Sequence, residues 1–306
     1  MIVVVCPGQG SQTPGFLEPW LQNPAYADQL REMSDRAGTD LVTAGTVADA
    51  DTIRDTAIAQ PLIVAAGLIA LSALFADGRR AGVGGIAGHS VGEITAAVGA
   101  EVLTSADALT LVGERGRAMK SAAELSPTGM SAVLGGDEAE LLARLTELGL
   151  EPANFNGGGQ IVVAGDLDGL AALAANPPAK SRVIPLQVAG AFHTRHMLPA
   201  VQRLTEVAAD LNPQSATLPL WTNRDGSTIT DGDAFVDLLV GQVSSPVRWD
   251  LCMQAFADAG VTGIIEVAPA GALVGLAKRA LRGIPSVAIK TPDDLLAAYD
   301  LIDQQA

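Results

Sequence analysis

The sequence predicts an α/β protein built around a mostly parallel sheet, with a smaller domain inserted into it. The first observation is that short apolar runs alternate with helix-like segments over residues 1–126 and again over 190–306, a pattern typical of parallel sheets. The second is that the order of elements changes between residues 127 and 189. With 306 residues, 48% of them hydrophobic and 17% charged, the chain can bury a large core in one or two domains.

The larger part begins with the apolar run 2–6, which predicts a first buried strand. Its helices are predicted from long segments rich in apolar residues, and its further strands from short apolar runs between turn residues. Helices are predicted near 25–37, 60–76, 106–124, 198–211, 234–243, 251–259 and 273–281, and strands near 83–87, 218–222 and 263–267.

The inserted part has its own order of elements, bounded by Pro127 and Gly190. That order, βαββαβ, is the order of a ferredoxin-like domain. We therefore divide the chain into a large domain, residues 1–126 and 190–306, and a small ferredoxin-like domain, residues 127–189. Within the small domain we predict strands at 130–134, 153–155, 161–164 and 183–188, and helices at 138–148 and 167–175.

Charge and composition exclude several classes of function. The net charge of −15 argues against nucleic acid or an anionic membrane as the main partner. The N-terminal run has no basic residues ahead of it and predicts no signal peptide, and the apolar stretch 62–76 is too short to span a membrane. Cys6 and Cys252 lie in apolar surroundings, so we expect no disulfide framework and a reduced, cytoplasmic compartment.

The pentapeptide Gly88-His89-Ser90-Val91-Gly92 carries the most chemical information. It follows a strand-like run and precedes a helix-like run, which is the context of a nucleophile elbow. At such a turn the serine hydroxyl is exposed, and the helix N-terminus favours a developing negative charge. The motif therefore predicts acyl transfer through an acyl-enzyme on a core resembling that of α/β-hydrolases.

A serine nucleophile needs a nearby base, and the chain has only three histidines, His89, His193 and His196. His89 is adjacent to the serine, and we expect its ring to point away. His193 and His196 belong to a loop that leaves the last strand of the small domain. His193 is nearer the strand end and is the predicted base. The alternative interpretation is a surface histidine on a loop.

Two glycine-rich segments allow other interpretations. Residues 82–87 fit G-x-G-x-x-A, but no helix opens at that turn, which disfavours a dinucleotide site. Residues 7–10 are not followed by the Gly-Lys-Ser/Thr of a phosphate-binding loop. A true α/β-hydrolase is a stronger rival, since Gly-His-Ser-x-Gly is common there. However, such enzymes place a histidine late in the chain, and none follows His196.

Taken in order, the motifs resemble those of the malonyl-CoA:acyl carrier protein transacylases of type II fatty acid synthesis. They are more distantly similar to the acyltransferase domains of polyketide synthases. The resemblance covers essentially the whole chain. Its motifs are residues 7–12 (PGQGSQ), 60–61 (QP), 88–93 (GHSVGE), 115–119 (RGRAM), 154–156 (NFN) with Gln160, 191–193 (AFH), and Gln242 ahead of 246–249 (PVRW).

The resemblance implies a Ser–His dyad, in which Ser90 is the nucleophile and His193 a base oriented by a main-chain carbonyl. It implies that the backbone N–H groups of Gln9 and Val91 form the oxyanion hole. It also implies that Arg115 binds the free carboxylate of malonate, for which a guanidinium offers a planar two-donor fork. The other residues that it places at the substrate site are Met119, Asn156, Phe192 and Gln242.

Some of these residues also have structural interpretations. Arg115 is compatible with a helix-surface cation paired with Glu114 or Glu124, and Met119 with ordinary core packing. Val91 stands where many relatives have leucine, which matters little because only its N–H is needed. A phenylalanine at the position of Phe192 accompanies malonyl selectivity in related synthase domains, and it favours malonyl here.

The resemblance implies a cytoplasmic acyltransferase that moves malonyl from coenzyme A to the phosphopantetheine thiol of acyl carrier protein. The route would be ping-pong, through a malonyl ester on Ser90. We expect no metal, no redox cofactor and a monomer. The alternatives are a discrete acyltransferase of a polyketide pathway, a serine hydrolase or editing thioesterase, and a silent carrier-binding module. Arg115 argues against the hydrolase, and the presence of both Ser90 and His193 argues against the silent module.

An acidic enzyme that binds an acidic carrier protein and CoA needs a local basic patch. The candidate is Lys278, Arg279 and Arg282, of which residues 278 and 282 are one helical turn apart. Arg195 and Lys290 are candidates for its rim. The alternative is a solvated helix end whose cations oppose the helix dipole.

Overall fold

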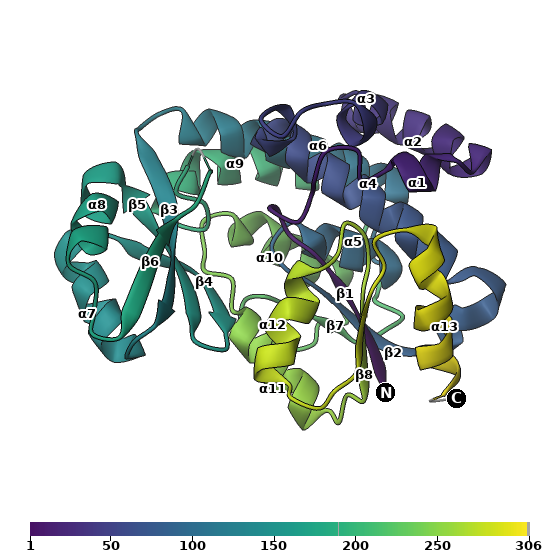
Figure 1. The fold of residues 1–306 in the computed structure, drawn as a ribbon. Coiled ribbons are helices and arrows are strands. Elements are labelled where there is room, and N and C mark those ends of the chain that lie inside the picture. Colours follow the sequence, from purple (N-terminus) through teal and green to yellow (C-terminus); the bar gives the residue numbers. More distant parts are fainter. Residues whose placement is uncertain (189, 305–306) are drawn as a thin grey trace.

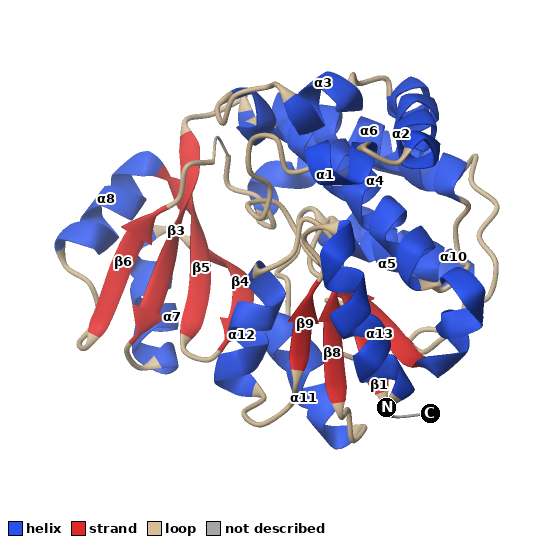
Figure 2. Ribbon diagram, turned by 45° about the vertical axis from the view of Figure 1, so that its right-hand side comes forward, coloured by secondary structure: helices blue, strands red, loops and turns tan. Residues whose placement is uncertain are grey.

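The protein folds around two separate sheets, seen side by side in Figures 1 and 2. The computed structural model describes residues 1–188 and 190–304. The first sheet is parallel, with the strand order β7-β2-β1-β8-β9. The second is antiparallel, with the order β4-β5-β3-β6. The strands are β1 (Ile2–Cys6), β2 (Val83–Gly88), β3 (Thr128–Gly135), β4 (Glu151–Gly157), β5 (Gln160–Asp166), β6 (Ser181–Pro185), β7 (Leu220–Trp221), β8 (Gly263–Glu266) and β9 (Ser286–Ala288).

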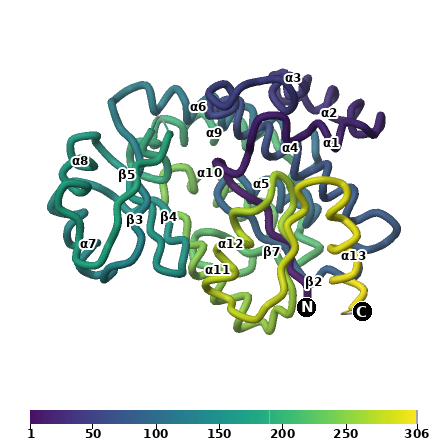
Figure 3. Tube along the Cα trace, viewed as in Figure 1, coloured from purple at the N-terminus to yellow at the C-terminus, as the bar shows by residue number. Residues whose placement is uncertain are grey.

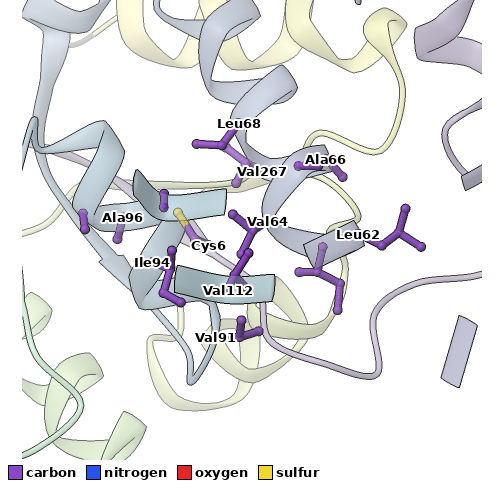
Figure 4. Packing of buried hydrophobic residues seen from close by; sticks show 14 of the residues in the cluster. Cys6, Leu62, Val64, Ala66, Leu68, Val91, Ile94, Ala96, Val112 and Val267 are labelled. Atoms are coloured by element: carbon purple, nitrogen blue, oxygen red, sulfur yellow. The ribbon is translucent and has the colours of Figure 1, made fainter. Parts of the chain in front are cut away.

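The parallel sheet lies between two layers of helices because its strands are apolar on both faces. In β1, Ile2, Val4 and Cys6 join one core cluster, while Val3 and Val5 join the other. The first cluster includes side chains of α4 (Thr56–Leu74), α5 (Gly92–Gly99) and α6 (Ser105–Ala123), some of which are drawn in Figure 4. The second includes α11 (Trp249–Asp258) and α12 (Ala272–Ala280).

Helix α4 is apolar all round, which is typical of a helix enclosed by protein. By length and composition it is able to cross a membrane, but 83% of its most apolar window is buried inside the fold. It is therefore the central helix of the core. The remaining helices of the large domain are α1 (Glu18–Leu21), α2 (Pro24–Ala37), α3 (Leu41–Thr46), α9 (Leu198–Ala208), α10 (Gly232–Gln242) and α13 (Leu295–Asp303), with short 3-10 turns η1 (Thr52–Arg54), η2 (Ala76–Gly82), η3 (Arg195–Met197) and η4 (Pro292–Asp294).

The antiparallel sheet has the strand order of the ferredoxin-like fold. Helices α7 (Glu138–Leu148) and α8 (Leu167–Ala175) supply leucines to a small core on one of its faces. Its edge strand β4 is attached to the large domain by two backbone hydrogen bonds. The N–H of Phe155 donates to Val247 O, and the N–H of Val247 donates to Ala153 O, both at 2.9 Å. The tube in Figure 3 shows both chain ends together, at the side of the large domain remote from this sheet.

The predicted fold class is confirmed, and two predicted helices, 138–148 and 167–175, have the predicted bounds. The strand expected at 183–188 is wrong at its end, since β6 pairs with β3 only as far as Pro185. Strand β9 and helix α13 were not predicted. The division at 127–189 stays a prediction, and Ala189 lies outside the described residues; the antiparallel sheet spans 128–185.

Candidate active site

Ser90 occupies a tight turn between β2 and α5, at the carboxyl end of the parallel sheet. Its φ is +54°, a left-handed conformation that costs a non-glycine residue energy and is often found at functional sites. The flanking glycines are required by close packing. A Cβ on Gly88 would lie 2.0 Å from the carbonyl carbon of Gly92, and one on Gly92 would lie 2.1 Å from Cys6 O. The turn is thus the predicted nucleophile elbow in geometry.

Asn223, just after β7, braces this turn from the side. Its Oδ1 accepts the backbone N–H of Ser90 at 2.7 Å, and its Nδ2 donates to Gly88 O at 2.7 Å. The buried side-chain amide of Asn223 therefore satisfies two backbone groups of the elbow, the N–H of Ser90 and the carbonyl of Gly88.

The serine hydroxyl lies 2.7 Å from Nε2 of His193. The other ring nitrogen, Nδ1, lies 2.9 Å from the main-chain oxygen of Gln242. A carbonyl oxygen can only accept, so Nδ1 carries the proton and Nε2 is free to accept the serine proton. Burial, aided by the charge of Arg115, lowers the pKa of His193 to about 3, so the ring is neutral at neutral pH.

Arg115 of α6 is buried beside the serine, which excludes the surface ion pairs considered for it. Its Nη1 donates to Gln60 Oε1 at 2.6 Å and its Nη2 to Gln242 Oε1 at 2.8 Å. Nη2 also lies 3.5 Å from the Ser90 hydroxyl. Among the described residues Arg115 has no ion-pair partner. Burial lowers its pKa to about 10, which leaves it charged at neutral pH.

These groups line a cleft of about 370 Å³ between the two sheets. Its floor comes from the ends of β1 and β2, and one wall from the face of the antiparallel sheet that α7 and α8 leave uncovered. The N–H groups of Gln9 and Val91 have no acceptor within the described part of the chain. The other predicted site residues that line this cleft are Met119, Asn156, Phe192 and Arg279.

The ring of His89 was expected to point away from Ser90, and it forms its hydrogen bond with Asn156, whereas the Ser90 hydroxyl pairs with His193. The Nε2 of His89 lies 2.9 Å from Asn156 Oδ1, and the ring lines the same cleft. Asn156 in turn donates to Gln160 Oε1 at 3.0 Å. Burial lowers the pKa of His89, so its ring acts as a neutral link between the elbow and β4.

The basic residues predicted for docking do not all lie together. Lys278 and Arg279 are exposed in the last turn of α12, and Arg279 reaches the cleft. Arg282 is exposed beyond the end of the helix at Ala280, so the prediction that residues 278 and 282 are one turn apart on the same helix is wrong. Arg195 instead forms an ion pair with Glu151 of the small domain. The side chain of Lys290 lies over Gly271, at the start of α12.

Sequence reasoning missed two buried polar residues, Asn223 and Glu93. Glu93 follows the elbow by one residue and is 1% exposed. Burial raises its pKa, while the N–H of Asn223 and the charge of Arg115 oppose that rise. An acidic residue within the apolar segment 92–99 was the one available sign of its role. Asn223 lies far from the elbow in the sequence and shows no sign of its role there.

In the described residues, no three His, Cys, Asp or Glu side chains gather as a metal site would require. The absence of a cofactor therefore stays a prediction from the sequence.

The fold and the elbow define the class, an α/β protein equipped for acyl transfer on a serine. The chain belongs to the acyl transferase family, whose domain model, described as "Acyl transferase domain", matches residues 3–292. It is 51% identical to the malonyl CoA-acyl carrier protein transacylase of Mycobacterium tuberculosis strain H37Rv, over 96% of this chain and 98% of that protein.

Solved structures agree with this assignment. The crystal structure of MCAT from Mycobacterium tuberculosis has a TM-score of 0.94 and 51% identity, and the match covers 96% of this chain and 98% of that one. A second similar structure, PlMCAT:AntF, is described as a type II PKS acyl-carrier protein in complex with its malonyl-transacylase. It has a TM-score of 0.91 and 28% identity, with 98% of this chain and 99% of that chain covered.

Proposed function

We propose that this protein transfers malonyl from malonyl-CoA to the phosphopantetheine thiol of acyl carrier protein. The observation that carries the proposal is Arg115, a buried cation held beside Ser90 by two neutral amide oxygens. Because no carboxylate of the described residues occupies its donors, the guanidinium can bind a carboxylate on the acyl group. A malonyl thioester carries such a group, and an acetyl thioester does not.

The reaction that this geometry supports is a ping-pong exchange. His193 Nε2 takes the Ser90 proton as Oγ attacks the thioester carbon, and the N–H groups of Gln9 and Val91 stabilise the oxyanion. The C–S bond breaks, and CoA leaves as a thiol with the proton from His193. The carrier thiol then gives its proton to His193 and attacks the malonyl ester, and as the ester C–O bond breaks His193 returns that proton to Ser90 Oγ, so atoms and charge balance.

Replacing Arg115 by alanine tests the proposal. The loss of a charged hydrogen bond is worth about 1.5–3 kcal/mol, so we expect malonylation of Ser90 to slow roughly 10- to 150-fold. Acetylation by acetyl-CoA should change much less, and discrimination between the two should relax. Single-turnover labelling with radioactive malonyl-CoA and acetyl-CoA measures both. Equal losses for the two substrates would show that Arg115 serves only the structure.

We also expect an unusual pH profile. Since the pKa of His193 is lowered to about 3, its ring stays neutral as the pH falls below the ordinary histidine value. The rate of Ser90 malonylation should therefore hold within about two-fold from pH 7 down to about pH 5, where a histidine with an ordinary pKa would cause a drop of roughly twenty-fold. Quenched-flow measurements of the acyl-enzyme across this range would reveal such a drop directly.

The pathway that the enzyme serves has two candidates. Type II fatty acid synthesis is favoured by the sequence motifs, such as residues 88–93 and 115–119, which resemble those of the transacylases of that pathway. A polyketide pathway is favoured by the solved complex with a type II PKS carrier. An editing hydrolase is disfavoured because it does not need a carboxylate-binding arginine. Turnover with purified carrier proteins of each pathway separates the candidates.

We place the carrier-docking surface on the basic end of α12, formed by Lys278, Arg279 and Arg282. All three are exposed, and neither Lys278 nor Arg282 has an ion-pair partner within the described residues. Arg279 reaches from this surface into the cleft, so a bound carrier would lie next to the entrance. Arg195 is held by Glu151, and the surface is therefore centred on α12.

Charge reversal tests this surface. In the double variant Lys278→Glu and Arg282→Glu, we expect KM for carrier protein to rise markedly, kcat to change less, and the difference to shrink at high salt. The matched control reverses the exposed Arg31 and Arg36 of α2, which changes net charge equally. A carrier KM equal to wild type at low salt would place docking elsewhere.

A cytoplasmic location, a monomeric state and independence from metals and redox cofactors complete the proposal. The two free cysteines, Cys6 and Cys252, are both buried, which suits a reducing compartment. Sedimentation at working concentrations tests the monomeric state. Assays with a chelator present test the independence from metals.

A further inference from the structure

A buried carboxylate that takes no part in the proposed steps lies directly behind the site. Glu93 is in the first turn of α5 and is 1% exposed. One of its oxygens accepts the backbone N–H of Asn223 at 2.6 Å. The other accepts the side-chain amide of Gln242. Both oxygens of Glu93 therefore accept hydrogen bonds, and burial raises its pKa to about 8, so the group is not fully ionised at neutral pH.

The neighbours of Gln242 leave its side-chain amide one possible orientation. Arg115 can only donate, so it needs the carbonyl oxygen of Gln242, which it meets at 2.8 Å. Glu93 accepts, so it needs the amide nitrogen. The order Glu93, Gln242, Arg115 is therefore a chain in which every donor faces an acceptor. The amide lies between Glu93 and Arg115 and keeps the two side chains out of direct contact.

Gln242 contributes to the site through its main chain and its side chain, and its side-chain nitrogen also donates to the main-chain oxygen of Ser90 at 3.3 Å. The main-chain oxygen of Gln242 holds Nδ1 of His193, and its side chain holds Arg115. Glu93 contacts only the side chain. A change at Glu93 should therefore reach the arginine without disturbing the hydrogen bond that orients the histidine.

We propose that Glu93 is a positioning residue for recognition of the acyl carboxylate. By accepting the Gln242 amide, it turns the Gln242 carbonyl toward Arg115 and fixes the guanidinium beside Ser90, while Glu93 itself stays one side chain away from the substrate. This inference rests on the proposed role of Arg115. It adds that selectivity for malonyl depends on a carboxylate that never contacts malonyl.

Glu93→Gln is the first test. The new amide can satisfy Asn223 with its oxygen, but its nitrogen then faces the nitrogen of Gln242. If Gln242 turns to relieve this, it presents a donor to Arg115. We expect malonylation to slow about ten-fold or more, with a raised KM for malonyl-CoA. Acetylation by acetyl-CoA and inactivation by a neutral sulfonyl fluoride should stay within about three-fold of wild type.

The control for this variant is Glu114→Gln. Glu114 precedes Arg115 and pairs with Arg117 and Arg203 near the surface. Its replacement by glutamine therefore removes one charge close to the site but leaves the hydrogen bonds from Glu93 through Gln242 to Arg115 in place. Wild type that gains no malonyl from malonyl-CoA would refute the proposed function itself. If wild type is malonylated, two results would refute only the role of Glu93. In the first, Glu93→Gln is malonylated as fast as wild type; in the second, its malonylation and acetylation are slowed equally.

A swap of the two side chains tests the order of donors even if Glu93→Gln folds poorly. Gln242→Glu alone places two carboxylates side by side in the interior. In the double variant Glu93→Gln and Gln242→Glu, residue 93 donates to residue 242, which still accepts from Arg115. We expect its melting temperature to exceed that of both single variants. A double variant no more stable than Glu93→Gln would overturn the proposal.

Discussion

After Ser90→Ala, incubation with malonyl-CoA should leave the mass of the protein unchanged, whereas wild type gains one malonyl group. The expectation follows from the elbow, because the Ser90 hydroxyl is hydrogen-bonded to His193 and reached by Arg115. Turnover should fall to background, since no acyl-enzyme can form. Intact-protein mass spectrometry, with holo-carrier added afterwards to remove any label, gives the answer.

The variant should keep its fold, which makes the result interpretable. Alanine retains the Cβ of serine, and the hydroxyl contacts only His193 and Arg115 among the described residues. Unchanged circular dichroism and an unchanged melting temperature within a few degrees would establish this. A folded variant that still accumulates malonyl would mean that another residue is the nucleophile.

His193→Ala should lower turnover by about 10²–10⁴-fold, the usual contribution of a positioned base. The serine would then have to lose its proton to water. His196→Ala is the matched control, because His196 lies three residues away on η3 and does not contact Ser90. Steady-state assays of both variants decide the point, and a larger loss for His196→Ala would reverse the assignment of the base.

The sequence predicted the chemistry of the elbow because that chemistry is local. Five adjacent residues set the turn, and the steric need for Gly88 and Gly92 can be read from their spacing. The central helix and the ferredoxin-like unit were predictable from long apolar segments and from the order of elements. Strand β9 was missed because it has only three residues, all half-buried, which is too few for a clear pattern.

The support of the site could not be predicted, because it joins residues far apart in the chain. Asn223 reaches Ser90 across 133 positions, and Gln242 reaches Glu93 across 149. A lone asparagine after a two-residue strand looks like any turn residue. The resemblance pointed to Gln242 as part of the site, but not to the orientation of its amide, which follows only from the positions of Arg115 and Glu93.

The attachment of β4 to the large domain has a consequence for how substrates enter. Its backbone bonds to Val247, together with the contact of Asn156 with His89, tie the two walls of the cleft at points next to the dyad. Swinging the small domain away would break these bonds and pull on the segment that follows Gln242. These bonds favour a cleft that keeps its width, and a thin, flexible arm suits such a cleft better than a bulky substrate. Coenzyme A and the carrier share a pantetheine chain. Its length would let the acyl group reach Ser90 without a movement of the cleft walls.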